Sequence, residues 1–485
     1  MLALGLAACS RPAQPPVNRL AILPFENLTG DASLDWISAA APAIVASEIA
    51  GSARTLPLLP PTVNDAYLGR ATRFVHGYFT GRDGALRFAI EVEDSSRHKM
   101  VSSSSVTGGV LDAMNAAARS LASDSHAFST SSAEAVTAWG HGDDERAVAI
   151  DPDFSLAWLD WIRKLTGEGK APEAIETARR ALARPGLRSR VDRARIQFEA
   201  AVLRKDAAAR EQALVELARL EPADEAAAAA LAQAEFNARK FAAAAAQYRN
   251  LRELDPANDG TMNSLGYAEV YAGNLDAARK SFEEYGRQPN QKTNSLDSLG
   301  EAYFVNGRFT EAEKYFMAAY QSNPSFLGGA DLLKAAYARW LGGDLKSADA
   351  AMKDYLAFRA RLRDPLLVWR EACWDYTTGR REEAIAKLQS APPNQKELAE
   401  RQAAVWRGTV FAPDNLPALR QAYEQAEPSS DGEARTFYAA ALLAAGRKEE
   451  ARLLVAFWPL PDSAGDPLFQ SLVYPQFVDL RKRLK

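Results

Sequence analysis

Few side chains in this 485-residue chain are spaced for chemistry. The histidines (His76, His98, His126 and His141) lack the short spacing of metal ligands, and the two cysteines, Cys9 and Cys373, are 364 positions apart. The sequence contains no Gly-x-Ser-x-Gly motif and no phosphate-binding loop. We therefore expect no metal, disulfide framework, cofactor or catalytic site, and predict that the protein is not an enzyme.

The composition argues against a nucleic-acid partner. The chain carries 58 Lys and Arg residues against 62 Asp and Glu residues, which gives a net charge of -4 rather than a basic footprint. Its hydrophobic content of 47% is sufficient for a large core. No stretch approaches the roughly 20 apolar residues of a membrane span.

A repeated spacing organises most of the chain. The best unit consists of Leu299, Gly300, Tyr303, Gly307, Ala312, Phe316, Ala319 and Pro324. Counting back from the loop position Gly307 in steps of 34 residues gives Gly273, Arg239 and Lys205, and counting forward in steps of 36 gives Gly343 and Gly379. A fixed period of this length predicts stacked helical hairpins, which offer an extended surface rather than a closed pocket.

These positions resemble the tetratricopeptide repeat (TPR). The resemblance implies an all-α TPR superhelical solenoid over residues 135–460, with about nine repeats of which the outer ones are degenerate. Residues 187–327 keep the 34-residue step without insertion and should be the most regular part. Residues 461–485 should cap the last hairpin, because a terminal unit has one face without a neighbour.

Residues 18–123 predict a small α/β domain. A buried strand at 20–25 precedes a turn, a helix interrupted by Pro42, a β-hairpin formed by 74–79 and 86–92, a further strand near 100–106 and a helix at 109–122. Asn27 and Asp31 follow the first strand, where they could line a ligand site or simply shape a turn and cap a helix, and we favour the turn. A serine-rich linker at 124–134 joins this domain to the hairpins.

The segments 20–35 and 77–88 resemble the TolB-like amino-terminal domain, which often precedes TPRs in bacterial proteins. The fold class expected for the whole chain is therefore α+β, with a small α/β domain followed by the helical solenoid. Members of that family are implicated in envelope assembly or occur beside signalling domains, and the resemblance implies no catalytic residues.

The first residues resemble a bacterial lipoprotein signal. An apolar run ends in Leu6-Ala7-Ala8-Cys9, which is similar to the lipobox in which Cys9 becomes lipidated, so residues 1–9 would be the signal and residues 10–17 a proline-rich tether. The residue after the cysteine, Ser10, resembles that of lipoproteins sorted to the outer membrane more than that of lipoproteins retained at the inner membrane. We expect a periplasm-facing protein of the cell envelope, in contact with the membrane through its lipid alone.

The TPR resemblance implies that the first helix of each hairpin lines a concave groove. Counting back from the loop positions predicts a protein-binding groove formed by Asn263, Tyr267, Asn294, Asp297, Glu301, Phe304, Tyr337, Trp340, Trp369 and Tyr376. The alternative, given equal weight, is that the aromatic side chains form the packed core. The Lys and Asn pattern of carboxylate-clamping relatives is missing, so chaperone tails are not expected as ligands.

We therefore predict a non-catalytic, lipid-anchored envelope scaffold that binds a protein or peptide in this groove. The alternative is a sensing or signalling protein whose TolB-like domain binds a small molecule or nucleotide and whose solenoid relays the signal.

Overall fold

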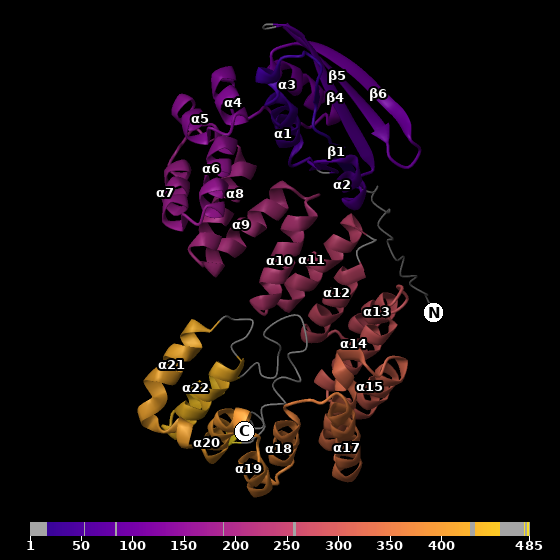
Figure 1. Ribbon diagram of the computed structural model, residues 1–485, viewed down its shortest axis with the longest axis vertical. Coiled ribbons are helices and arrows are strands. Elements are labelled where there is room, and N and C mark those ends of the chain that lie inside the picture. Colours follow the sequence, from indigo (N-terminus) through magenta and orange to yellow (C-terminus); the bar gives the residue numbers. More distant parts are fainter. Residues whose placement is uncertain are drawn as a thin grey trace, which may run out of the picture. The chain divides into compact units, whose positions relative to one another are not determined.

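The computed structural model describes residues 17–52, 54–82, 85–187, 189–255, 259–426, 432–455, 480 and 483–484. A sheet region comes first and is followed by helices (Figure 1). The predicted signal at 1–9, the tether at 10–17 except Val17, and nearly all of the predicted cap at 461–485 lie outside these residues. Across the described ranges, no helix combines the length and hydrophobicity needed to cross a bilayer.

The first elements form one mixed sheet. Its strands are β1 (Asn18–Ile22), β2 (Glu26–Asn27), β3 (Thr55–Leu58), β4 (Arg73–Arg82), β5 (Ala85–Asp94) and β6 (Lys99–Gly108), in the order β3-β1-β4-β5-β6 with β2 paired to β4. β1 is parallel to β3 and β4, whereas β4, β5 and β6 form an antiparallel meander. The predicted hairpin is confirmed, since Phe79 of β4 pairs with Phe88 of β5.

Besides the short strand β2, a strand and a helix of this region were not expected from the sequence. They are β3 and the short helix α2 (Val63–Leu68), which lie on either side of Pro60 and Pro61. Pro57 lies within β3, at the edge of the sheet. An edge strand pairs on one side only, so it tolerates a residue without an N–H group.

Helices α1 (Ile37–Ile49) and α3 (Val110–Leu121) pack together and share one hydrophobic core with the sheet (Figure 1). Pro42 lies inside α1, where it has no N–H group to donate to the carbonyl of Ser38 four residues earlier. That carbonyl instead accepts a hydrogen bond of 3.0 Å from the backbone N–H of Phe25. The helix therefore continues through Pro42, because the loop after β1 satisfies the freed acceptor.

Helices then follow one another as pairs. Their bounds are α4 (Ala133–Gly140), α5 (Asp144–Ile150), α6 (Ser155–Gly167), α7 (Ala171–Leu182), α8 (Arg190–Leu203), α9 (Ala207–Leu220), α10 (Glu225–Asn237), α11 (Phe241–Leu254), α12 (Asp259–Tyr271), α13 (Leu275–Tyr285), α14 (Lys292–Val305), α15 (Phe309–Ser322), α16 (Ala330–Leu341), α17 (Leu345–Arg361), α18 (Leu367–Thr377), α19 (Arg381–Gln389), α20 (Lys396–Arg407), α21 (Leu416–Gln425), α22 (Gly432–Ala444) and α23 (Lys448–Leu454). The predicted helix pairs are thus present from α8 to α19.

The loop positions counted from the sequence share one backbone conformation. Lys205, Arg239, Gly273, Gly307, Gly343 and Gly379 all have positive φ, with values of 54°, 61°, 84°, 71°, 94° and 99°. Each lies between the two helices of a pair. A left-handed residue ends the first helix and turns the chain towards the second, which is why glycine is common at this position.

Small residues allow the two helices of a pair to approach. A Cβ atom added to Gly266 would lie 2.4 Å from the ring of Phe282, and one added to Gly300 would lie 2.4 Å from the ring of Phe316. Ala312, four residues before Phe316, has no exposed surface. The close approach of paired helices at small residues is therefore as predicted, but these aromatic rings of the second helix pack against the backbone of the first helix of the same pair.

The structure divides into two compact units, one of Met1–Leu231 and Asn250–Pro256 and the other of Ala232–Arg249 and Ala257–Lys485. In the first unit, ion pairs join the sheet region to α10 and to the residue that follows α11, because Arg19 contacts Glu225 and Arg70 lies 2.6 Å from Asp255. The segment expected as a linker is also packed. Phe128 is buried against Trp139 and Phe154.

Candidate functional site

The predicted groove residues lie on four successive first helices, α12, α14, α16 and α18. Six of them are buried, namely Tyr267, Asp297, Glu301, Phe304, Tyr337 and Tyr376. The other four, Asn263, Asn294, Trp340 and Trp369, are half-buried. The structure therefore separates the predicted set into a buried row and a more accessible row.

Polar side chains join α12 to α14. The hydroxyl of Tyr267 donates to Glu301 Oε2 at 2.5 Å and lies 3.2 Å from the hydroxyl of Ser298. Ser298 in turn donates to Asn263 Oδ1 at 3.0 Å. Two residues from each helix thus form one hydrogen-bonded group between neighbouring hairpins.

A buried lysine joins α14 to α16. Lys334 is 1% exposed, and its Nζ lies 2.7 Å from Asp297 Oδ1 and 2.5 Å from Glu301 Oε1. A buried ammonium group is stable only when it is paired and hydrogen-bonded, and here two carboxylates supply those contacts. Lys334 was not among the predicted groove residues, although a lysine between Leu333 and Ala335 in an otherwise apolar helical turn is a signal for a buried charge.

The two inter-helix contacts repeat the same geometry. Ser298 and Lys334 both lie nine residues before a loop glycine, whereas their acceptors Asn263 and Asp297 both lie ten residues before the preceding one. In α14 and α16 the same position therefore donates to the neighbouring position of the first helix before it. The second contact uses charged groups where the first uses neutral ones.

Burial changes the acid-base properties of this cluster. It raises the pKa of the Tyr267 hydroxyl well above its usual value, and the charges of Glu301 and Asp297 act in the same direction. Asp331, in the first turn of α16, is 1% exposed and lies close to the carboxylate of Asp297. Burial, followed by the charge of Asp297, raises the pKa of Asp331, so this carboxyl group stays protonated where an exposed aspartate ionises.

The buried aromatic residues of the predicted groove pack within the chain. Tyr337 meets Trp374 of α18 edge-on at 5.5 Å, and Tyr376 stacks on Trp406 of α20 at 4.5 Å between ring centroids. Phe304 meets Phe309 edge-on at 5.3 Å. For these side chains the structure favours the core interpretation, because neighbouring helices occupy their ring faces.

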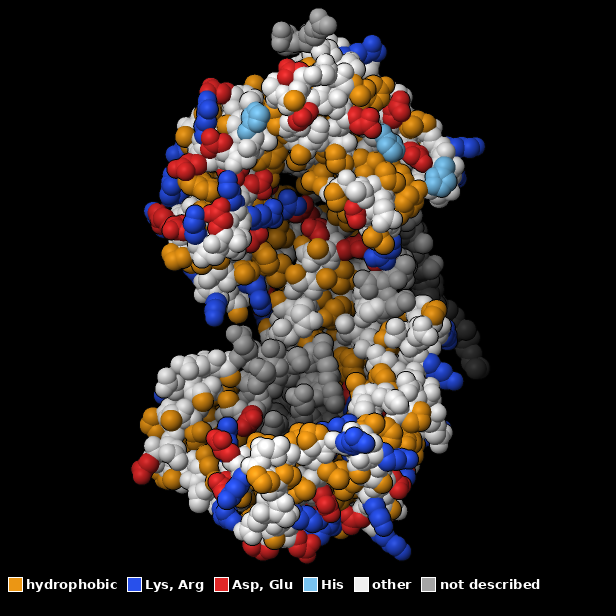
Figure 2. Space-filling model, viewed as in Figure 1, with side chains coloured by type: hydrophobic (Ala, Val, Ile, Leu, Met, Phe, Trp, Pro, Cys, Tyr) orange, Lys and Arg blue, Asp and Glu red, His pale blue; other side chains and the backbone are white. Residues whose placement is uncertain are grey.

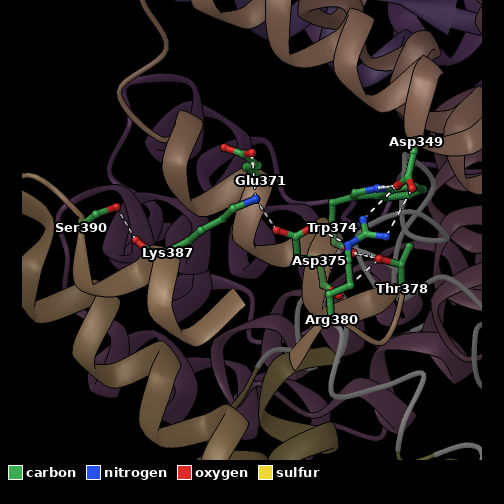
Figure 3. A network of polar contacts seen from close by, with 8 residues as sticks. All are labelled: Asp349, Glu371, Trp374, Asp375, Thr378, Arg380, Lys387 and Ser390. Carbon is green, nitrogen blue, oxygen red and sulfur yellow. Dashed lines mark hydrogen bonds and ion pairs between the residues drawn. The ribbon is translucent and has the colours of Figure 1, made fainter. Parts of the chain in front are cut away.

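A second polar network lies on α17, α18 and α19 (Figure 3). Asp349 accepts from Trp374 Nε1 at 2.7 Å and pairs with Arg380 at 2.9 Å, and Arg380 also pairs with Asp375 at 2.8 Å. Lys387 contacts Asp375 and lies 2.8 Å from Glu371. These contacts all join neighbouring helices of one chain, so their evident role is structural.

Asn27, the last residue of β2, and Asp31 belong to one turn. The Asn27 amide nitrogen donates to the backbone carbonyl of Asp31 at 2.9 Å, and Asp31 Oδ1 accepts from the Ser33 N–H at 2.9 Å. This is the turn-and-cap arrangement favoured from the sequence.

Among the residues that the structure describes, groups that could bind a metal are not brought together. No cluster of three or more His, Cys, Asp or Glu side chains has a suitable arrangement in the described ranges. Cys373 is buried at 3% exposure, and burial raises the pKa of its thiol above the usual value. Cys9 lies outside the described residues.

Fold and site together define a class, a protein of repeated helical hairpins preceded by a small mixed sheet. No family model matches the chain, and no curated protein matches it. Among solved structures, the chain is similar to YrrB, described as a TPR protein with an unusual peptide-binding site (15% identity, 40% of this chain, 97% of that chain, TM-score 0.34). It is also similar to the MamA protein (14% identity, 35% of this chain, 92% of that chain, TM-score 0.31). A third similar structure is that of Naa15/Naa10 bound to HypK-THB (14% identity, 67% of this chain, 63% of that chain, TM-score 0.32).

Proposed function

We propose that the protein is a non-catalytic scaffold whose hairpins bind another protein along the first-helix face of α12, α14, α16 and α18. One observation carries this proposal. The buried row fixes the helices side by side and leaves Asn263, Asn294, Trp340 and Trp369 half-exposed on them. Tryptophan and asparagine side chains on rigid helices suit the docking of a peptide or helix.

Charge is consistent with a protein partner rather than a nucleic acid. Lys and Arg side chains are interspersed with Asp and Glu over the face drawn in Figure 2. The net charge of the chain is -4. A nucleic-acid binder would instead present a clustered basic surface.

The proposal includes a lipid anchor at Cys9 and a periplasm-facing location in a bacterial envelope. It is supported by the lipobox-like Leu6-Ala7-Ala8-Cys9 and the proline-rich residues that follow. Metabolic labelling with palmitate should mark the wild type and not a Cys9→Ser variant. Label that persists in this variant would refute the anchor.

The scaffold is tested by affinity capture with the full chain. We expect Trp340→Ala combined with Trp369→Ala to lose a partner that the wild type retains. Tyr320→Ala is the matched control, because Tyr320 is a half-buried aromatic residue of the second helix α15. Equal capture by wild type, double variant and control would exclude this face as the binding surface.

A second candidate is ligand binding beside the sheet region. A cavity of about 670 Å³ in the first unit is lined by Gly51, Asp124, Asp151, Asp153 and Arg190 among others. The three carboxylates outnumber Arg190 and Arg184, which lies 3.4 Å from Asp153, and this favours a cationic small molecule over a nucleotide. Calorimetric titration with spermidine and with ATP tests this, and the lack of heat with both would exclude it.

A further inference from the structure

A tryptophan-lined pocket opens in the first unit between α5, α6 and α7. Its volume is about 530 Å³, and its lining includes Trp158, Trp161, Arg179, Arg180 and Arg184. This is large enough for a small organic group or one side chain of a partner. It involves none of the residues of the predicted groove.

Two indole rings form one side of this pocket. Trp158 and Trp161 are stacked with their centroids 5.6 Å apart and an angle of 26° between the rings. Trp158 is 3% exposed, and its Nε1 donates to the carbonyl of Pro152 at 2.9 Å, which fixes the ring. Trp161 is half-buried, so part of its ring is accessible to a ligand while Trp158 packs against it.

Arg180 differs from the other two arginines of the pocket. Arg179 pairs with Glu176 at 2.6 Å, and Arg184 lies 3.4 Å from Asp153. Arg180 is exposed, and none of the described carboxylates lies within ion-pairing distance of it. Its Cζ instead lies 5.3 Å from the ring of Trp158 and 5.5 Å from that of Trp161.

This stacking prepares the guanidinium group for a ligand. The cation–π contacts hold the group in place without using its N–H donors. A planar guanidinium with free donors binds a carboxylate or phosphate through two parallel hydrogen bonds. Glu145 also lines the pocket, and its carboxylate repels any negative charge that a ligand carries in addition to the group paired with Arg180.

We propose that this pocket binds an oxoanion, a carboxylate or phosphate, joined to an aromatic or apolar group. The oxoanion pairs with Arg180, and the attached group contacts Trp161 and the apolar lining of Val148, Ala149 and Pro152. The proposal is independent of the scaffold function, because all its residues belong to the first unit and the groove helices belong to the second.

The test uses the full-length protein labelled with ¹⁵N in its indole groups, with Trp161→Phe to assign the Trp161 signal. Phenyl phosphate and 3-phenylpropionate are titrated, with inorganic phosphate for comparison. We expect the Trp161 signal to move in a saturable way with at least one phenyl compound. Arg180→Gln should weaken that binding by about tenfold or more.

Arg163→Gln is the matched control. Arg163 is an exposed arginine of α6 that pairs with Glu199 and does not line the pocket, so its substitution should leave the affinity unchanged. Binding of phenyl phosphate alone would support a phosphate ligand, and binding of 3-phenylpropionate alone a carboxylate ligand. The proposal is overturned by an unmoved Trp161 signal, by equal affinity of Arg180→Gln, or by inorganic phosphate binding as well as phenyl phosphate.

Discussion

Lys334 Nζ lies 2.7 Å from Asp297 Oδ1, and each residue is 3% exposed or less. The pair connects α14 to α16. Glu301 contacts the same ammonium group, so one lysine pairs with two buried carboxylates.

Replacing Lys334 should destabilise the protein strongly. Lys334→Met removes the ammonium group that contacts both buried carboxylates, and we expect a loss of about 3–5 kcal/mol in the free energy of unfolding. Urea unfolding followed by circular dichroism measures it. The exposed lysine of α15 provides the control Lys314→Met, which should change stability by less than about 0.5 kcal/mol. A similar small effect at Lys334 would contradict the buried pairing.

Asp331→Asn should change the pH dependence of stability. The raised pKa means that the folded chain holds a proton that the unfolded chain releases above about pH 4, so the wild type loses stability as the pH rises from there through the folded pKa. The variant lacks this loss and should gain about 1–3 kcal/mol relative to wild type by pH 8.

Unfolding measured at pH 4, 6 and 8 tests the Asp331 prediction. Asp344→Asn is the control, because Asp344 is an exposed helix cap whose pKa is lowered by hydrogen bonds from Ser347. Its contribution is present above the unfolded pKa and is lost as the pH falls, which is the opposite sign. If the difference in free energy of unfolding between the wild type and Asp331→Asn did not vary with pH, the raised pKa of Asp331 would be disproved.

Gly300→Ala separates steric from conformational effects. Alanine favours a helix over glycine by about 1 kcal/mol, but the added Cβ atom would lie 2.4 Å from the Phe316 ring. We expect the clash to dominate, with a net loss of about 1–3 kcal/mol. At Gly307 a Cβ atom meets nothing within 4 Å, so Gly307→Ala should cost only about 1 kcal/mol, from its φ of +71°. Chemical unfolding compares the two, and a stabilised Gly300→Ala protein would rule out the close packing.

Asp375→Asn should weaken the network of Figure 3. Asp375 is 5% exposed and contacts both Arg380 and Lys387. Loss of its charge should cost about 1–3 kcal/mol in thermal or urea unfolding. Ser390→Ala is the control, because Ser390 donates only to the Lys387 carbonyl at the exposed end of the network, and it should have little effect. Equal stability of the two variants would show that the buried contacts contribute nothing.

Cys373 should resist thiol reagents in the folded protein. Burial and a raised pKa both disfavour the reactive thiolate. In a Cys9→Ser background, where Cys373 is the remaining cysteine, we expect reaction with Ellman's reagent at pH 8 to be at least about a hundredfold slower than in urea. Rapid stoichiometric labelling of the folded protein would place the thiol at the surface instead.

Local chemistry explains why the hairpin pattern could be predicted. A position between two helices needs a left-handed residue, and close helix packing needs glycine opposite an aromatic ring. Both requirements place particular residue types at fixed spacing in the sequence, as at Gly300 and Gly307. The spacing also located Lys205 and Arg239, which have positive φ without being glycine.

The groove was predicted less completely, because side-chain burial depends on neighbours distant in sequence. The repeat spacing placed Tyr267, Asp297 and Glu301 on the groove-facing side of successive first helices but did not show that they are buried. Lys334 reaches Asp297 across 37 positions of sequence. No local pattern specifies such a contact.

The sequence by itself thus determined the helix pairs, their loops and the sheet hairpin, since these follow from backbone conformation and periodicity within short segments. Only the tertiary structure decided which charged groups are buried together, that Pro57 occupies an edge strand, and that Arg180 lies over two indole rings. Those outcomes depend on which surfaces meet when separate elements pack, and packing sets burial, pairing and pKa.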